Sequence, residues 1–299
     1  CQYTGWAFGN SWRRASQGEH LVPTGIWWAR DRKALEAFLA DGEVQTFLPG
    51  EGILGRVLAD ARPQWVVDIG SDANCPRARS AAQSGLRSAF AFPVRAGIEV
   101  AAILEFLTSD LILPDAELLQ LVEQIGVQLG RVIERKRAEE KLVYEALHDP
   151  LTGLPNRALY MQDVKTALRR GRRDPENLFA TLFLDLYGFK LVNDGLGHAA
   201  GDQLLIECAE RLQKVLVDQT SGAAAEGRRW PRWTLARLGG DEFTVLLDGM
   251  DTRDQASEVA QMMHQALKPS YVFDAQEVFI GSSIGIAHGS SDYLDVMDL

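Results

Sequence analysis

The chain reverses its direction at Arg237-Leu238-Gly239-Gly240-Asp241-Glu242-Phe243. Apolar and β-branched residues dominate on both sides of this turn, from Trp233 to Leu238 and from Glu242 to Leu247. Two such runs, separated by two glycines and an aspartate, predict an antiparallel β-hairpin with a tight turn. We therefore expect a sheet to form around this hairpin, with Asp241 and Glu242 at its tip.

The segments on either side of the hairpin predict two more strands and two helices. Their apolar patterns place strands at 178–186 and 278–287, and helices at 199–217 and 255–267. The resulting order, β-α-β-β-α-β, is that of a ferredoxin-like fold. The small residues at 222–226 predict a loop insert to which no chemistry can be assigned.

Three carboxylates are expected to converge at one edge of this sheet. Asp185 lies near the end of the first strand, and the Asp241-Glu242 pair lies on the neighbouring hairpin. A single carboxylate at a strand end or turn is most often an ordinary solvated residue. A convergent set is instead typical of Mg²⁺ sites for phosphoryl and nucleotidyl transfer. The loop that contains Gly188 and Lys190 would suit a polyphosphate.

The part of the chain before residue 147 predicts a separate α+β domain. A buried strand is expected at 65–69, and strands at 88–94 and 99–107 would form a hairpin through Ala96-Gly97. The fold class expected for the whole chain is therefore α+β and α/β: a domain with an antiparallel sheet, then a ferredoxin-like domain, joined by a long helix.

That helix is expected to begin after Pro114 and to end before Pro150. Its apolar residues alternate four and three apart, as in a coiled-coil seam: Leu118, Val122, Ile125, Leu129 and Val132, continuing through Lys136 and Glu139 to Val143 and Ala146. We expect a continuous helix that pairs in a homodimer. The alternative is an amphipathic helix that closes the first domain, followed by a charged connector.

Composition excludes several classes of protein. The 299 residues contain 31 Lys and Arg against 41 Asp and Glu, so the net charge of −10 argues against binding to nucleic-acid backbones. Cys1, Cys75 and Cys208 have neither metal-site nor disulfide-framework spacing, which predicts a reducing, cytoplasmic location. No apolar run is long enough for a membrane span. The chain begins at Cys1 rather than Met, and we expect it to be a piece of a longer protein.

Four ordered motifs of the second part resemble the GGDEF domain, the diguanylate cyclase family. The signature is the hairpin stretch 237–243 itself. The other three motifs are His148-Asp149-Pro150-Leu151-Thr152-Gly153-Leu154-Pro155-Asn156-Arg157, then Phe189-Lys190-Leu191-Val192-Asn193-Asp194 with Gly197-His198 and Gly201-Asp202, and finally Ser283-Ile284-Gly285-Ile286-Ala287.

This resemblance implies the synthesis of cyclic di-GMP from two GTP molecules, with release of two pyrophosphates. Asp185, Asp241 and the backbone carbonyl of Leu186 would bind one or two Mg²⁺ or Mn²⁺ ions. Glu242 would deprotonate or position the attacking 3′-hydroxyl. Because each domain would hold one GTP, two domains must meet face to face.

The resemblance also implies the residues that bind GTP. Asn193 and Asp202 would hydrogen-bond the guanine edge. Lys190 would act on the phosphates and contribute to catalysis. The remaining expected substrate contacts are Gly188, Phe189, Gly239 and Gly240.

The second part departs from the family's pattern at three places. Tyr187 stands where the family commonly has Asp. Trp230-Pro231-Arg232-Trp233 lacks both anchors of the family's Arg-x-x-Asp product-inhibition site, so we expect no inhibition through that site. The sequence also stops at Leu299, before the family's last helix, whose basic residues contact the terminal phosphates.

The first part resembles a GAF domain from Trp6 to about Glu134. The likeness rests on Trp6 and Trp12, on 49–55 and 65–68, and on 85–88 with 93–94. The expected domains are a GAF-like sensor at 1–130, a helical linker at 131–147 and a GGDEF domain at 148–299. The ligand of the GAF domain is unknown. Attachment of a bilin at Cys75 is disfavoured because no His follows at close spacing, and the tryptophans are expected to be core residues.

Three functions are weighed from the sequence. The leading one is a GAF-regulated diguanylate cyclase acting as a homodimer. The second is a GTP-binding GGDEF module that controls a following EAL phosphodiesterase domain. The sequences at 191–194, 202–205 and 243–247 resemble those of GGDEF domains that an EAL domain follows. A scaffold with inactive sites is least supported, since the expected site residues are largely intact.

Overall fold

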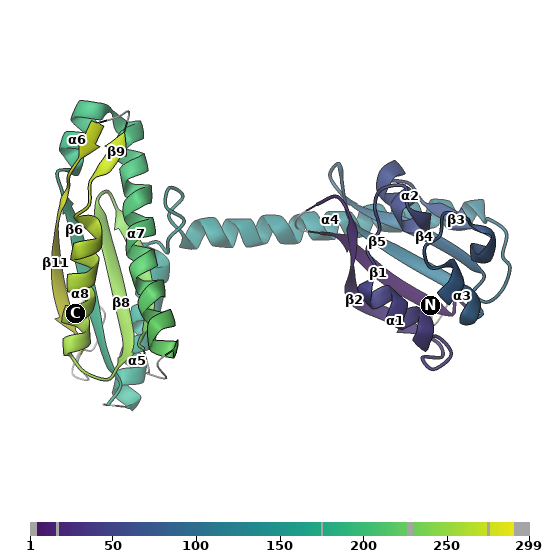
Figure 1. Cartoon of the computed structure of the whole chain (residues 1–299), viewed down its shortest axis with the longest axis horizontal. Coiled ribbons are helices and arrows are strands. Elements are labelled where there is room, and N and C mark those ends of the chain that lie inside the picture. The colour runs from purple at the N-terminus through teal and green to yellow at the C-terminus, as the bar shows by residue number, and fades with distance from the viewer. Residues whose placement is uncertain (1–4, 16–17, 175, 226–229, 274–275, 290–299) are drawn as a thin grey trace. The chain divides into compact units, whose positions relative to one another are not determined.

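The computed structural model describes residues 5–15, 18–174, 176–225, 230–273 and 276–289. The chain divides into two compact units, Cys1–Glu140 and Lys141–Leu299 (Figure 1). Helix α4 (Ala116–Leu147) contributes residues to both units. Within the described ranges, no helix is both long and apolar enough to cross a membrane.

The first unit is built on a five-stranded antiparallel sheet. Its strands lie in the order β2 (Leu21–Ala29), β1 (Phe8–Arg14), β5 (Glu99–Thr108), β4 (Ser88–Ala96) and β3 (Gln64–Val66). The predicted hairpin is confirmed, since β4 pairs with β5 from Ser88↔Thr108 to Ala96↔Glu99. The strand predicted at 65–69 is too long. It ends at Val66 because the side chain of Asp68 accepts a hydrogen bond from the N–H of Gly70 (3.3 Å) and begins the 3-10 turn η1 (Ile69–Ser71).

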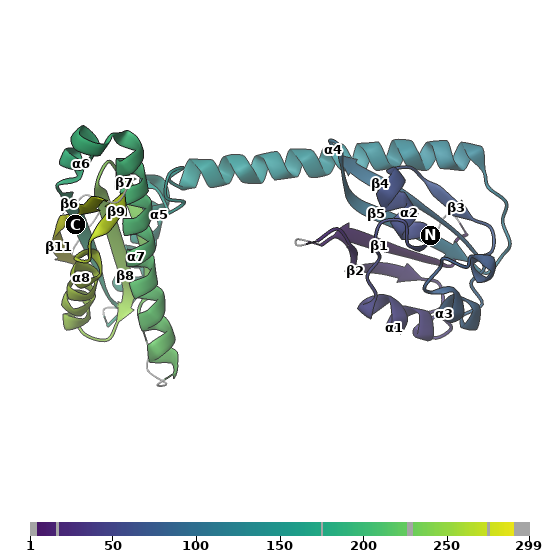
Figure 2. The same cartoon turned by 45° about the horizontal axis from the view of Figure 1, so that its top comes forward.

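Helices cover both faces of this sheet (Figure 2). Helices α1 (Glu36–Val44), α2 (Gly52–Asp60) and α3 (Ala78–Gln83) pack on one face, where the core contains Phe8, Trp12 and Ile103. The N-terminal half of α4 packs on the other face, against Trp6, Phe90 and Phe92. Trp6 and Trp12 are buried, which confirms that they are core residues.

Helix α4 packs closely on the five-stranded sheet because two of its contact positions are glycines. The buried positions of the helix are Val122, Gly126 and Gly130, and a Cβ on Gly130 would lie 1.7 Å from the carbonyl oxygen of Arg95. The predicted seam is therefore partly wrong. Val122 faces its own sheet, whereas Ile125, Leu129 and Val132 are exposed.

The second unit has a four-stranded antiparallel sheet. The strands lie in the order β11 (Gly281–His288), β6 (Leu178–Tyr187), β8 (Glu242–Met250) and β7 (Arg232–Gly239). This is the order of a ferredoxin-like sheet, and the predicted β-α-β-β-α-β succession is confirmed. Helices α7 (His198–Ala225) and α8 (Asp254–Leu267) pack on one face, and α5 (Arg157–Arg173) packs on the other.

Two local predictions in this unit are wrong. Residues 222–225 continue α7 instead of forming a loop, because the alanines at 223–225 favour a helix. The strand predicted at 278–287 begins at Gly281, because Val278 closes a separate small hairpin of β9 (Tyr271–Phe273) and β10 (Gln276–Val278).

Candidate active site

The strand register brings the predicted carboxylates to one end of the sheet. β6 and β8 pair antiparallel so that Asp185 lies directly opposite Glu242. Asp241 lies in the turn that joins β7 to β8. Gly240 of this turn has a φ of +55°, a left-handed conformation that residues with a side chain rarely adopt. Asp185 and Glu242 are exposed and Asp241 is half-buried. All three side chains therefore belong to one solvent-accessible edge.

These carboxylates have no cationic partner among the described residues, since none of the three forms an ion pair there. Like charges at directly opposed strand positions repel each other, and a bound cation would remove that repulsion. Mg²⁺ usually takes one or two protein carboxylates and completes its shell with water and substrate phosphates. The described residues contain no group of three or more acidic, His or Cys ligands. A divalent ion held by Asp185 and Asp241 would therefore need further ligands from water or a phosphate.

A glycine starts the helix that follows β6. Gly188 has a φ of +89° and is the N-cap of α6 (Phe189–Leu196). This conformation turns the chain so that the first N–H groups of α6 are available to an anion. Lys190 is exposed in the first turn of α6, and Phe189 packs partly on the core. The arrangement supports the predicted polyphosphate loop.

The two predicted guanine-binding residues lie on helices that touch each other. Asn193 is half-buried on α6, and Asp202 is exposed near the start of α7. The residue before Asp202 is Gly201, where a Cβ would lie 1.9 Å from Oδ1 of Asn193. Only glycine therefore leaves room for the amide of Asn193 at this contact.

One arrangement that sequence reasoning missed joins the hairpin to the motif at 148–157, here called the opening motif. Arg237 donates from Nη1 to both carboxylate oxygens of Asp149 (3.0 and 2.9 Å). Its Nε and Nη2 donate to the carbonyl oxygen of Gly240 (3.0 and 2.8 Å). Arg237 therefore holds the backbone of the turn that carries Asp241. Both residues stand in the recognised motifs, but their pairing spans 88 positions, and no local sequence pattern predicts it.

Asp149 is also held from its own side. The backbone N–H and the hydroxyl of Thr152 each donate to its Oδ2 at 2.8 Å. Burial alone would raise the pKa of Asp149, but the hydrogen bonds from Thr152 and Arg237 outweigh it and lower that pKa. Asp149 is thus kept ionised as the anchor of Arg237.

The loop at 148–156 is hydrogen-bonded to the last turn of α4. The amide of Asn156 donates to the carbonyl oxygen of Ala146 (2.8 Å), and the hydroxyl of Tyr144 donates to that of Gly153 (3.3 Å). Asn156 also caps α5 by accepting from the N–H groups of Ala158 and Leu159. The last turn of α4, the loop at 148–156 and the turn that carries Asp241 are therefore linked by direct contacts.

Comparison with known families agrees with this geometry. Residues 146–299 match the family described as diguanylate cyclase, GGDEF domain, and residues 2–134 match the GAF domain. The chain belongs to the GGDEF diguanylate cyclase family. A GAF domain precedes its GGDEF domain, as the sequence predicts.

Two curated relatives illustrate the family's range. Over 151 residues the chain is 42% identical to MucR of Pseudomonas aeruginosa, named a bifunctional diguanylate cyclase/cyclic di-GMP phosphodiesterase; the match covers 50% of this chain and 20% of MucR. Over 177 residues it is 36% identical to the diguanylate cyclase TpbB of the same organism, covering 58% of this chain and 38% of TpbB. The matches thus span well under half the length of either relative.

Solved structures in the family include two GGDEF proteins. The GGDEF domain of TpbB from Pseudomonas aeruginosa is 35% identical, covers 47% of this chain and 74% of that one, and has a TM-score of 0.40. A sensory box/GGDEF family protein from Caulobacter crescentus is 38% identical, covers 48% of this chain and 83% of that one, and has a TM-score of 0.39.

Tyr187 has a structural role in this GGDEF domain. It ends β6, where it pairs with Gly281 of β11, and a Cβ on Gly281 would lie 3.4–3.5 Å from atoms of the tyrosine side chain. A tyrosine that covers a cross-strand glycine supplies packing that the glycine lacks.

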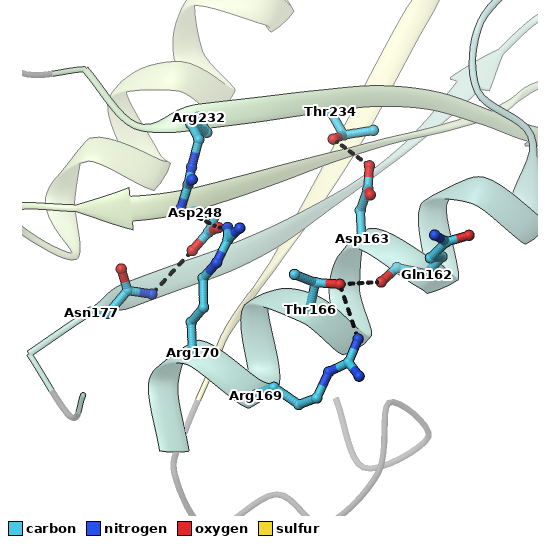
Figure 3. A network of polar contacts seen from close by, with 9 residues as sticks. All are labelled: Gln162, Asp163, Thr166, Arg169, Arg170, Asn177, Arg232, Thr234 and Asp248. Atoms are coloured by element: carbon cyan, nitrogen blue, oxygen red, sulfur yellow. Dashed lines mark hydrogen bonds and ion pairs between the residues drawn. The ribbon is translucent and has the colours of Figure 1, made fainter. Parts of the chain in front are cut away.

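The stretch that lacks the product-inhibition anchors takes part in a separate ion cluster (Figure 3). Asp248, only 5% exposed, accepts from Arg170 Nη1 (2.5 Å), Arg232 Nη2 (3.1 Å) and Asn177 Nδ2 (3.0 Å). Arg232 therefore pairs with Asp248 on the neighbouring strand. The indole N–H of Trp233 donates to the hydroxyl oxygen of Thr220 (2.9 Å). The absence of product inhibition through this stretch stays a prediction.

Proposed function

We propose that this chain supplies the sensor and cyclase modules of a GAF-regulated diguanylate cyclase, which condenses two GTP molecules into cyclic di-GMP and two pyrophosphates. The observation that carries the proposal is that Asp185 and Glu242 lie opposite each other without a cationic partner in the described part of the chain, beside a turn that Arg237 holds in place. An exposed, uncompensated acidic pair is otherwise unfavourable in a sheet.

Each residue of the edge has a role in this proposal. Asp185 and Asp241, with the carbonyl of Leu186, would hold Mg²⁺ or Mn²⁺. Such an ion neutralises charge on the phosphates during nucleotidyl transfer. Glu242 would accept the proton of the attacking 3′-hydroxyl or position that hydroxyl. Lys190 and the N–H groups after Gly188 would bind phosphate oxygens, and Gly239 and Gly240 would let the nucleotide approach the turn.

Guanine would be read between α6 and α7. The amide of Asn193 and the carboxylate of Asp202 offer both acceptors and a donor, which matches the mixed edge of guanine. Phe189 supplies an apolar contact in the same region.

The active form in this proposal is a homodimer, because each site holds one of the two substrates. The exposed apolar residues of α4 support pairing along this helix. They form an exposed apolar stripe along one side of the helix, made of Leu121, Ile125, Leu129 and Val132. Burial of such a stripe against a second copy is the usual way to stabilise a coiled coil.

The test is product analysis of the full-length protein that contains this chain. Incubation with GTP and Mg²⁺ should yield cyclic di-GMP and pyrophosphate in a 1:2 ratio, a ratio fixed by the reaction. Absence of cyclic di-GMP from a dimeric preparation that binds GTP would refute the proposed activity.

A second function is favoured by the relative MucR, whose name includes a phosphodiesterase activity and of which the match covers 20%. In that case the GGDEF domain would bind GTP and regulate a following EAL domain. The discriminating result is GTP that binds, is not consumed, and changes the rate of cyclic di-GMP hydrolysis by the full-length protein.

The cytoplasmic location remains a prediction, consistent with the free thiols of Cys75 and Cys208.

A further inference from the structure

Tyr187 lies where the acidic edge meets the loop proposed to bind phosphates. It is the last residue of β6 and directly precedes Gly188, the N-cap of α6. Along β6 it stands two positions after Asp185, a distance of about 7 Å. Because side chains alternate along a strand, Tyr187 and Asp185 project from the same face of the sheet. The phenol therefore borders both the acidic edge and the loop.

Packing on the edge strand β11 holds the ring of Tyr187 on one side. Tyr187 pairs with Gly281, and a Cβ on this glycine would lie 3.4 Å from Cδ2 and 3.5 Å from Cβ of the tyrosine. The ring thus lies on a backbone that carries no side chain. The other side of Tyr187 is open, since the residue is 56% exposed. A ring that is already held loses less conformational freedom when its hydroxyl binds a ligand.

The hydroxyl of Tyr187 is free to bind such a ligand. It forms no hydrogen bond within the part of the chain that the structure describes. A phenol hydroxyl is neutral and donates one hydrogen bond, whereas the ionised carboxylates of Asp185 and Glu242 can only accept. Next to these anions, Tyr187 therefore offers a donor that does not repel a phosphate.

The expected orientation of GTP brings its terminal phosphates toward this donor. Asn193, the proposed guanine contact, lies farther along α6, and Tyr187 lies on the other side of Gly188 in the chain. If the guanine lies at Asn193 and the phosphates lie at the loop, the phosphates farthest from the nucleoside are the nearest to Tyr187.

From this placement we propose that the hydroxyl of Tyr187 donates a hydrogen bond to an oxygen of the β- or γ-phosphate of GTP, and so favours a triphosphate over a monophosphate. Hydrogen bonds to a charged acceptor are stronger than those between neutral groups. The inference rests on the proposed function, because it takes GTP as the ligand of the same site.

The test compares Tyr187→Phe with the wild type by calorimetry of the full-length protein with Mg²⁺, using GTP and GMP as ligands. Phenylalanine keeps the ring on Gly281 and removes only the hydroxyl. GTP affinity should fall about tenfold. The affinity for GMP, which lacks the β- and γ-phosphates, should stay the same.

Tyr187→Ala separates the hydroxyl from the packing of the ring. It should lower GTP affinity at least as much as Tyr187→Phe does. Of the two variants it alone should lower the melting temperature, because it uncovers Gly281. A purely structural role would instead leave GTP affinity unchanged in Tyr187→Phe.

The readout is binding, so the result does not depend on whether cyclic di-GMP is formed. Unchanged GTP affinity in Tyr187→Phe, or equal losses for GTP and GMP, would overturn the contact and leave the proposed function standing. Wild-type protein that binds no GTP would refute the proposed function and this contact together.

Discussion

At the scale of single residues, the charged groups of this GGDEF domain fall into two kinds, those with several hydrogen-bond partners and those without a cationic partner in the described ranges. Asp149, Arg237 and Asp248 are satisfied by several hydrogen bonds each and act as structural anchors. Asp185 and Glu242 face each other on neighbouring strands without a cationic partner in the described ranges. A bound cation would relieve the repulsion between these two carboxylates, which is why we propose the metal at this edge.

Asp149 gives a pH-dependent prediction for stability. Because its pKa is lowered in the folded protein, its ion pair stabilises the fold fully above the ordinary carboxyl pKa of about 3.9, and this contribution is lost as the pH falls through the lowered value. Asp149→Asn should lower the free energy of unfolding by about 1–3 kcal/mol at neutral pH. Denaturant titrations should show this difference shrinking as the medium becomes more acidic than about pH 4.

The matched control for this measurement is Asp194→Asn, which changes an exposed aspartate on α6. It should leave the free energy of unfolding nearly unchanged. A destabilisation by Asp149→Asn that is constant down to strongly acidic pH would show that the ion pair with Arg237 is not its cause.

Asn193 gives a prediction for substrate recognition. Asn193→Ala removes one proposed partner of guanine and should weaken the binding of GTP by about 1–3 kcal/mol, measured by calorimetry with Mg²⁺ present. The binding of inosine triphosphate, which lacks the exocyclic amino group, should separate loss of that contact from general damage to the site. Unchanged GTP affinity would show that guanine is not read at Asn193.

At the scale of elements, the contact between α6 and α7 depends on a missing side chain. A Cβ at position 201 would lie 1.9 Å from Oδ1 of Asn193 and 3.3 Å from the ring of Phe189. Gly201→Ala should therefore displace the side chain of Asn193 and reduce GTP affinity, while the free energy of unfolding changes little because that side chain can rotate away.

Gly195→Ala is the control for Gly201→Ala, because a Cβ there would meet no atom within 4 Å on the same helix pair. It should leave GTP affinity unchanged and keep or raise the melting temperature, since alanine favours a helix. Equal losses of GTP affinity in the two variants would refute the role of this close contact.

The elements also show what sequence reasoning can and cannot reach. The hairpins at 88–108 and 232–250 were predictable because alternating apolar runs flank short glycine turns. The strand at 65–69 was overextended because a side-chain hydrogen bond of Asp68 outweighed strand propensity. The opposition of Asp185 and Glu242 follows from topology. The link between Arg237 and Asp149 does not, because it depends on a loop conformation that no periodic pattern encodes.

At the scale of the whole molecule, the chain combines a GAF domain with a GGDEF domain through α4. The limits predicted at 1–130, 131–147 and 148–299 remain a proposal beside the compact units, which divide after Glu140. The end of α4 is hydrogen-bonded to the loop at 148–156. Asp149 of this loop pairs with Arg237. We propose that a change in the pairing of α4 reaches the turn that carries Asp241 through these contacts, which lie within one unit.

The dimer is tested by charge placed on the exposed apolar stripe of α4. Ile125→Glu should raise the dimer dissociation constant at least about tenfold, since two buried carboxylates would repel each other, and should lower cyclase activity at low protein concentration. Sedimentation velocity measures the first effect. The control Gln213→Glu adds the same charge on the surface of α7. A dimer that is unaffected by Ile125→Glu would place the pairing elsewhere.

The central claim is that the acidic edge of the GGDEF domain performs metal-dependent condensation of GTP, and Asp241 tests it most directly. Cyclic di-GMP formation by the full-length protein with GTP and Mg²⁺ should fall at least about a thousandfold in Asp241→Ala, a loss of about 4 kcal/mol of transition-state stabilisation. Asp218→Ala, on the exposed surface of α7, should retain full activity. Wild-type activity in folded Asp241→Ala would contradict the account.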